Sequence, residues 1–187
     1  MKIGFAFCGS FCTFAPAIEQ LKHLADIGHE MIPIMSFNAS SIDTRFGAAA
    51  DHIARIETIC ARNIIKTIAD AEPLGPSRPM EQLIVAPTTG NTLAKLASGI
   101  TDTAVTMAAK AHLRCDRPLL LAIASNDAMS QNLQNIARVI TRRSVYLVPM
   151  RQDDPTGKPH SLVSDFSRLY DSFEAMRRGE QLRPLFI

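Results

Sequence analysis

The stretch that decides the fold is LIVAPTTGNTLAKLASGITD, residues 83–102. It opens with an apolar run typical of a buried strand and closes with apolar residues at the spacing of an amphipathic helix. Small hydroxyl residues, a glycine and an asparagine fill the joint between the two, residues 88–92. One helix cap needs a single such side chain, whereas this joint offers four. We therefore interpret the joint as part of a ligand site as well as a helix start.

The same alternation of strand and helix continues on both sides of this stretch. Apolar runs predict strands over residues 2–8, 30–37, 82–86, 118–124 and 144–149, with a brief one over 63–66. Helical spacing predicts helices over residues 15–27, 48–60, 93–99, 103–114, 129–141 and 162–178. Polar, proline- or glycine-bearing loops are expected over residues 38–44, 72–79 and 153–159. This order predicts an α/β fold with a doubly wound parallel sheet, a flavodoxin-like or Rossmann-like three-layer sandwich. With no repeat or linker, we expect one domain over residues 1–187.

Composition excludes several classes of function. Hydrophobic residues make up 47% of the chain and charged residues 20%, as in ordinary soluble globular proteins. The net charge is +2 and the basic residues are scattered, so we expect no nucleic-acid partner. No apolar run approaches the ~20 residues needed to span a bilayer, and the N-terminus lacks a signal-peptide layout, so we expect a cytoplasmic protein with no membrane partner. The four cysteines are expected to be buried reduced thiols, and the five dispersed histidines predict no metal site.

Small polar residues follow four of the predicted strands. In an open α/β sheet the ligand binds outside the carboxyl ends of the strands, where small residues let a phosphate approach the backbone. The sequence therefore predicts a phosphate-bearing ligand. There is no G-x-G-x-x-G and no Walker A lysine, so a dinucleotide or a nucleoside triphosphate is not favoured. Taken singly, Ser10, Ser36 and Ser125 are better explained as helix caps than as ligand contacts.

Three motifs resemble one family. APTTGNTLAKLASGITD, residues 86–102, is similar to the "PASANT-xAK-xAxGxxD" segment of the homo-oligomeric flavin-containing cysteine decarboxylases, which bind FMN. The turn at residues 9–10 resembles the phosphate-binding turn of that family, and SNDAM at 125–129 resembles its "MNxxM" substrate segment. The resemblance implies that Asn91 and Asn126 act in catalysis, Asn126 from the substrate side. It implies FMN as the cofactor, held by Gly9, Ser10, Ser36, Thr88, Thr89, Gly90 and Asn91.

Two departures from the family pattern bear on the reaction. The decarboxylases carry a histidine shortly before the strand that leads into the PASANT segment, whereas this chain has EPLGPSRPMEQ at residues 72–82, with Arg78 as its one cation. The first position of the "MNxxM" segment is Ser125. Both departures argue against oxidative decarboxylation of a peptidyl or pantothenoyl cysteine. They are compatible with the same flavin-binding frame acting on another substrate.

A narrower resemblance covers nearly the whole chain. FCGSFCTF (7–14), DTRFG (43–47) and AEPLGP (71–76), together with the two segments above, are similar to the group of dipicolinate synthase B subunits within this family. That resemblance implies a sporulation oxidoreductase of the mother-cell cytoplasm, which oxidises dihydrodipicolinate together with a separate A subunit. Whether this chain is catalytic or supports the A subunit stays open. The alternatives are an FMN-dependent decarboxylase of a small cysteine-containing substrate and a cofactor-free scaffold, in which phosphate or sulfate could occupy the site.

A dicarboxylate substrate would require cations near the site, because an unpaired buried carboxylate is costly. Arg45 could bind a carboxylate through two hydrogen bonds, or it could form a structural ion pair with Asp43. Arg78 and Lys95 are the other cations expected nearby, although Lys95 could simply be solvated. Thr44 could cap the following helix, and Asp102 is expected to cap or pin the turn at 99–103.

The family resemblance also implies a homo-oligomer built from trimers. The alanine- and methionine-rich helix at residues 103–111 would suit a close-packed subunit contact as well as it suits the core.

Overall fold

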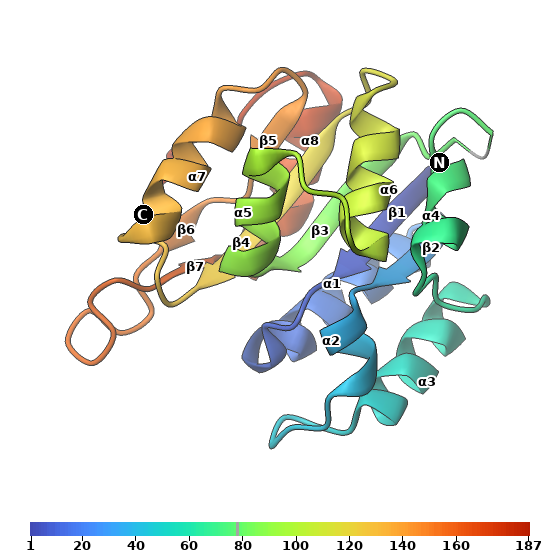
Figure 1. Ribbon diagram of the computed structural model, residues 1–187, viewed down its shortest axis with the longest axis horizontal. Coiled ribbons are helices and arrows are strands. Elements are labelled where there is room, and N and C mark those ends of the chain that lie inside the picture. The colour runs from blue at the N-terminus through green and yellow to red at the C-terminus, as the bar shows by residue number, and fades with distance from the viewer. Residues whose placement is uncertain (78) are drawn as a thin grey trace.

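Seven strands lie in one sheet, in the order β2-β1-β3-β4-β7-β6, with β5 also paired to β4 (Figure 1). The computed structural model describes residues 1–77 and 79–187. Strands β1 to β5 are parallel to one another, and their order β2-β1-β3-β4-β5 is that of flavodoxin-like folds. The strands are β1 (Lys2–Phe7), β2 (Glu30–Met35), β3 (Gln82–Thr88), β4 (Leu119–Ser125), β5 (Val145–Leu147), β6 (Met150–Arg151) and β7 (Leu162–Ser164).

Helices cover both faces of the sheet, and the result is the predicted three-layer sandwich. Figure 1 shows α5 and α6 in front of the sheet and α8 behind it. Within the described residues, no helix has both the length and the apolar character that a membrane crossing requires. The helices are α1 (Phe14–Asp26), α2 (Phe37–Ser41), α3 (Ala49–Cys60), α4 (Ile68–Ala71), α5 (Gly90–Ser98), α6 (Ala104–Leu113), α7 (Gln131–Ile140) and α8 (Leu169–Arg177).

The strands read as continuous apolar runs because each of their faces is buried in a separate core. Ile3, Phe5 and Phe7 of β1 belong to one core, which helices α1, α3 and α8 complete. Ala6 of the same strand points to the opposite core, under α5, α6 and α7. Alternate side chains of a strand point to opposite faces. In a strand that is covered on both sides, neither set of side chains faces solvent, so the pattern of alternating polar residues is missing.

Strand β3 runs two residues further than the sequence predicts, through Pro87 to Thr88. A bulge makes this possible: Val85 pairs with Leu121, but Thr88 pairs with Ile123. The Thr88 hydroxyl donates a 2.7 Å hydrogen bond to the Val85 carbonyl within the bulge. Helix α5 then begins at once, at Gly90 rather than at residue 93, because Thr89 caps it.

The sheet is mixed rather than wholly parallel, which corrects the sequence prediction at the C-terminal end. Residues 162–178 were expected to form one helix, yet Leu162–Ser164 is strand β7, antiparallel to both β4 and β6. The parallel neighbour β5 pairs only with 119–121 of β4, so the last residues of β4 keep an open edge that β7 occupies. The final helix, α8, starts only at Leu169.

Three shorter segments also differ from the prediction. The expected loop at 38–44 contains helix α2, because the Ser36 hydroxyl accepts a hydrogen bond from the Ala39 amide. The expected strand at 63–66 is reduced to one bridge between Ile34 and Ile65. That bridge gives the Pro33 carbonyl of β2 a partner, since the Ile65 amide donates to it at 2.9 Å. The loop at 72–79 includes a 3-10 turn, Glu72–Leu74, and Arg78 lies outside the described residues.

Helix α6, for which the sequence left a subunit contact open, packs its small residues into the core of its own chain. Ala104, Ala108 and Ala109 are all buried there. At the end of this helix His112 is fully buried, and its Nε2 lies 2.9 Å from the Pro118 carbonyl oxygen. Its Nδ1 has no hydrogen-bond partner among the described residues. Burial lowers the pKa of His112 to about 4, so the ring is neutral at physiological pH.

This burial predicts a pH-dependent loss of stability. An unfolded histidine titrates near pH ~6.5. The free energy of unfolding should therefore be greatest above that pH. It should fall by up to about 3 kcal/mol as the pH drops toward the pKa of His112 in the folded protein. The free energy of unfolding, measured by denaturant at several pH values in this range, should depend less steeply on pH for a His112→Gln variant than for the parent. The exposed His160→Gln serves as the control and should keep the parent slope. Equal slopes for both variants would contradict the assignment.

Candidate functional site

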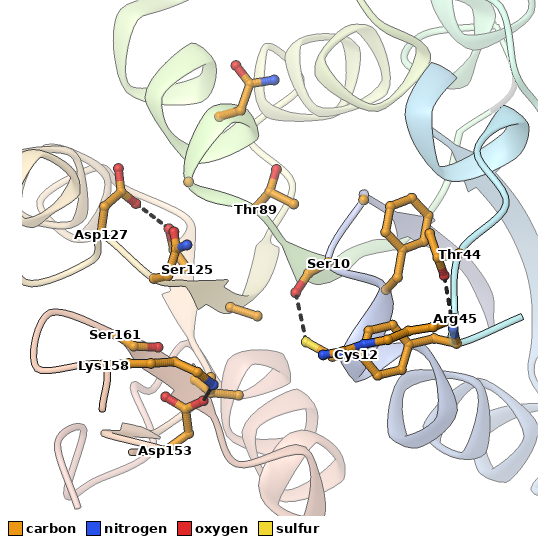
Figure 2. Close-up of a pocket in the computed structure, with 18 residues that line it drawn as sticks. Ser10, Cys12, Thr44, Arg45, Thr89, Ser125, Asp127, Asp153, Lys158 and Ser161 are labelled. Atoms are coloured by element: carbon orange, nitrogen blue, oxygen red, sulfur yellow. Dashed lines mark hydrogen bonds and ion pairs between the residues drawn. The ribbon is translucent and has the colours of Figure 1, made fainter. Parts of the chain in front are cut away.

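A cavity of about 700 Å³ opens at the carboxyl ends of β1, β3 and β4 (Figure 2). It lies where the strand order reverses between β1 and β3, the usual ligand position in open α/β sheets, and its volume suits a bound small molecule. Its walls come from the turns after these strands, from the 42–47 loop and from the 152–161 loop between β6 and β7. Seven of the predicted site residues line it: Gly9, Ser10, Arg45, Thr89, Gly90, Asn91 and Asn126.

The hydroxyl of Ser10, in the turn after β1, does not cap a helix. The Ser10 amide donates to the Cys8 carbonyl at 2.8 Å, and the Ser10 carbonyl accepts from the Thr13 amide at 3.1 Å. The Ser10 hydroxyl, however, makes no capping hydrogen bond, and its contact is the Cys12 sulfur at 3.9 Å. The amides of Phe11 and Cys12 precede the first hydrogen bond of the 3-10 turn, so they too are free to donate. This corner of the cavity therefore offers several donors to an anion.

The hydroxyls after β3 are mostly used within the protein. The Thr89 hydroxyl accepts from the Thr92 amide at 3.2 Å and so caps α5. The Thr92 hydroxyl donates to the Cys8 sulfur at 3.2 Å, which ties the end of β1 to the first turn of α5. Burial raises the pKa of the Cys8 thiol to about 11, and the sulfur stays protonated. Of the four polar side chains at the joint, the exposed Asn91 is the one left for a ligand.

Two of the predicted cofactor residues lie outside the cavity lining. Ser36 is 8% exposed, and its hydroxyl caps α2. Thr88 is fully buried, and its hydroxyl is bonded inside the β3 bulge. In both cases the side chain bonds to a backbone group of the protein itself, and for Ser36 this is the capping role that the sequence predicts.

The segment after β4 is organised around Asp127. The Ser125 hydroxyl donates to this carboxylate, and Asn132 donates to both of its oxygens, at 2.9 and 2.8 Å. The hydrogen bond from Ser125 is the main cause that keeps the pKa of Asp127 below its usual range. The carboxylate is therefore charged, and both of its oxygens accept hydrogen bonds within the protein. Asn126, which lies between Ser125 and Asp127 in the sequence, is exposed at the cavity.

Gly90 allows the ends of β3 and β4 to pack together. A Cβ at this position would meet the Ser125 hydroxyl, would lie 2.6 Å from Asn132 Nδ2 and would lie 2.8 Å from Asp127 Oδ1. The missing side chain therefore serves close packing rather than room for a ligand. It also brings the Asp127 carboxylate beside the first turn of α5, where the helix dipole favours negative charge.

Arg45 lies in a tight turn and has no ion-pair partner among residues 1–77 and 79–187. The Thr44 and Gly47 backbones bond to each other at 3.1 Å in both directions, and the Arg45 guanidinium stands 4.9 Å from the centre of the Phe46 ring. The ion pair with Asp43 that the sequence left open is not formed, because the Asp43 carboxylate accepts the Ala49 amide at 2.8 Å and starts α3. Across the described part of the chain, Arg45 has no carboxylate within ion-pairing distance. Thr44 orders this turn and does not cap α3.

Lys95 lies away from the cavity. Lys95 forms a 2.8 Å ion pair with Asp102, which pins the turn after α5 as expected of that aspartate. Arg78 falls outside the described residues. All four cysteines are free thiols, as expected, but of the four Cys8 alone is buried: Cys60 and Cys115 are partly exposed, and Cys12 is exposed at the cavity.

One wall of the cavity was not predicted from the sequence. It belongs to the 152–161 loop and β7, which contribute Asp153, Lys158, Ser161 and Val163. The prediction missed this wall because β7 was interpreted as the start of a helix, so nothing placed the preceding loop over the strand ends. Its signal in the sequence would have been a second polar loop followed by a short apolar run after the last parallel strand.

Comparison with known proteins supplies the family. The Flavoprotein family model matches residues 1–165. The dipicolinate synthase B subunit of Bacillus subtilis (strain 168) is 39% identical over 186 residues, covering 100% of this chain and 93% of that protein. The crystal structure of the dipicolinate synthase B subunit from Bacillus halodurans matches with a TM-score of 0.91 at 36% identity, over 100% of this chain and 95% of that one.

A more distant structure shares the fold alone. The FMN-dependent cysteine decarboxylase SpaF has a TM-score of 0.70 at 19% identity, over 96% of this chain and 97% of its own. The likeness along the whole chain and the family model lead to one assignment. This chain belongs to the Flavoprotein family, in the group that contains the dipicolinate synthase B subunits.

Proposed function

We propose that this chain is the B subunit of a dipicolinate synthase and binds FMN. With a separate A subunit, it contributes to the oxidation of dihydrodipicolinate to dipicolinate in the mother-cell cytoplasm of a sporulating bacterium. The observation that carries the proposal is the 39% identity to the B subunit from Bacillus subtilis, which extends over 100% of this chain.

The residues at the strand ends fit a phosphate-bearing flavin. Ser10, whose hydroxyl caps no helix, lines the cavity with Phe11 and Cys12, and these residues lead into the 13 residues of α1. Such a helix start favours an anion. The rings of Phe11 and Phe46 add flat apolar surface to the same cavity. When bound there, FMN would supply an acceptor for the hydride that a dihydropyridine loses on becoming aromatic.

The residues of the chain itself would bind and orient the dicarboxylate. Arg45, which forms no ion pair within the part of the chain that the structure describes, has a planar guanidinium that can hold one carboxylate through two hydrogen bonds. Asn126 is exposed at the cavity, next to the hydrogen-bonded Asp127, and its amide can align the ring of the substrate. Asn91 faces the cavity from the first turn of α5 and would contact the cofactor or the reacting part of the substrate.

FMN binding is the first test. The purified protein, reconstituted with FMN, should show flavin absorption bands. A Ser10→Ala variant should bind FMN about tenfold more weakly, since it loses a hydrogen bond to a charged phosphate. Ser98→Ala, an exposed serine at the far end of α5, should bind like the parent. If the parent retains no flavin, the cofactor-free scaffold becomes the better description.

Arg45→Lys tests the carboxylate contact. Lysine keeps the charge but loses the two-point geometry, so substrate binding should weaken by about 1–3 kcal/mol while flavin content stays constant. The measurements are substrate KM and flavin content with the A subunit present. Arg55→Lys, an exposed arginine on α3, is the matched control. Flavin loss or unfolding that accounts for the whole defect would make Arg45 a structural residue.

We also propose a homo-oligomer built from trimers. Three large apolar side chains are exposed on α2 and the loop after it: Phe37 at 72%, Ile42 at 41% and Phe46 at 45%. An exposed group of this kind beside a ligand cavity favours a subunit contact there. Light scattering should give a mass that is a multiple of three chains, and Phe37→Asp should lower it. A monomeric parent at micromolar concentration would refute the proposal.

A further inference from the structure

The loop between β6 and β7 forms the wall of the cavity that faces Arg45. Figure 2 shows Asp153, Lys158 and Ser161 on one side of the opening and Arg45 with Thr44 on the other. The two sides are more than a hundred residues apart in the chain. They meet because β7 pairs with the open edge of β4.

Backbone hydrogen bonds fix the position of Lys158 in this loop. The Lys158 amide donates to the Asp154 carbonyl at 2.8 Å, and the Ser161 amide donates to the Lys158 carbonyl at 3.0 Å. The loop is also joined to the segment after β4, because the Met129 amide donates to the His160 carbonyl at 2.8 Å. Lys158 is therefore held on the same framework as Asn126.

The ammonium of Lys158 can exchange its present partner, Asp153, for an anionic ligand. Its ammonium lies 2.9 Å from Asp153 Oδ2, but the lysine side chain is 55% exposed, and so open a pair contributes little to stability. The side chain of the buried Ser161 is the leading cause of the lowered pKa of Asp153, with Lys158 next. The charge of this carboxylate therefore does not depend on the ammonium alone, and Lys158 can turn to a ligand.

The charges along the cavity favour a ligand with two anionic ends. Four charged side chains line it: Arg45, Asp127, Asp153 and Lys158. Both carboxylates are engaged, whereas Arg45 is unpaired within the described residues and Lys158 is exchangeable. We infer that Lys158 binds the second carboxylate of the dicarboxylate substrate, across the cavity from Arg45. This inference rests on the proposed function and names a specificity-determining residue for it.

The test compares a dicarboxylate with a monocarboxylate on the full chain, reconstituted with FMN and the A subunit. Calorimetric titration with pyridine-2,6-dicarboxylate and with pyridine-2-carboxylate should show that the parent prefers the former. Lys158→Gln should weaken dicarboxylate binding about tenfold, the effect of losing one charge-assisted contact, and should leave the monocarboxylate nearly unaffected. Lys158→Arg, which keeps the charge, should recover most of the affinity.

The control is Lys22→Gln, which breaks a comparably exposed 2.6 Å ion pair with Asp26 on α1 and should bind both ligands like the parent. Flavin content is measured for every variant. The inference is overturned if Lys158→Gln changes neither affinity, weakens both ligands equally, or loses its flavin. A parent that binds flavin but neither pyridine acid would overturn the proposed function as well, so the two failures can be told apart.

Discussion

The site depends on the close contact between the first turn of α5 and the loop after β4. Ser125, Asp127 and Asn132 occupy the space that a side chain at position 90 would fill. Asp127 stays charged because neutral donors surround it, and its charge lies beside the start of a helix, where it is stabilised. One carboxylate thereby sets the distance between two strand ends and turns Asn126 outward. A larger residue at position 90 would move Asn91 and Asn126 apart.

Much of the fold could be predicted because burial on both faces leaves a simple pattern. The runs at β1, β3 and β4 place apolar residues in both cores, and α1, α3 and α6 carry matching stripes. The failures occur where tertiary pairing decides. Residues 162–178 hold apolar residues at helical spacing, yet 162–164 form a strand because β4 extends beyond β5 and offers them backbone partners. No local pattern contains that information.

The place of the cavity could also be predicted, since the carboxyl ends of parallel strands meet at one edge. The role of each hydroxyl there could not. Ser10, Ser36 and Thr89 all follow strands and precede helical turns, but Ser36 and Thr89 accept a backbone amide, and Ser10 does not. The difference is set by backbone angles that residue type alone leaves undetermined. The position of Lys158 at the cavity could not be predicted for another reason: it depends on the pairing of β7 with β4.

The pairing of β7 with β4 determines when the cavity is completed as the chain is synthesised and folds. The cavity is bounded by residue 9 at one end of the chain and by residue 163 near the other. A ribosome therefore releases the strand ends, the Arg45 turn and the Asp127 cluster well before the wall opposite Arg45 exists. Only after the last strand joins β4 is the cavity closed on that side. A nascent or truncated chain would thus hold a sheet and half a pocket, so a ligand that spans both walls would select chains whose synthesis is complete.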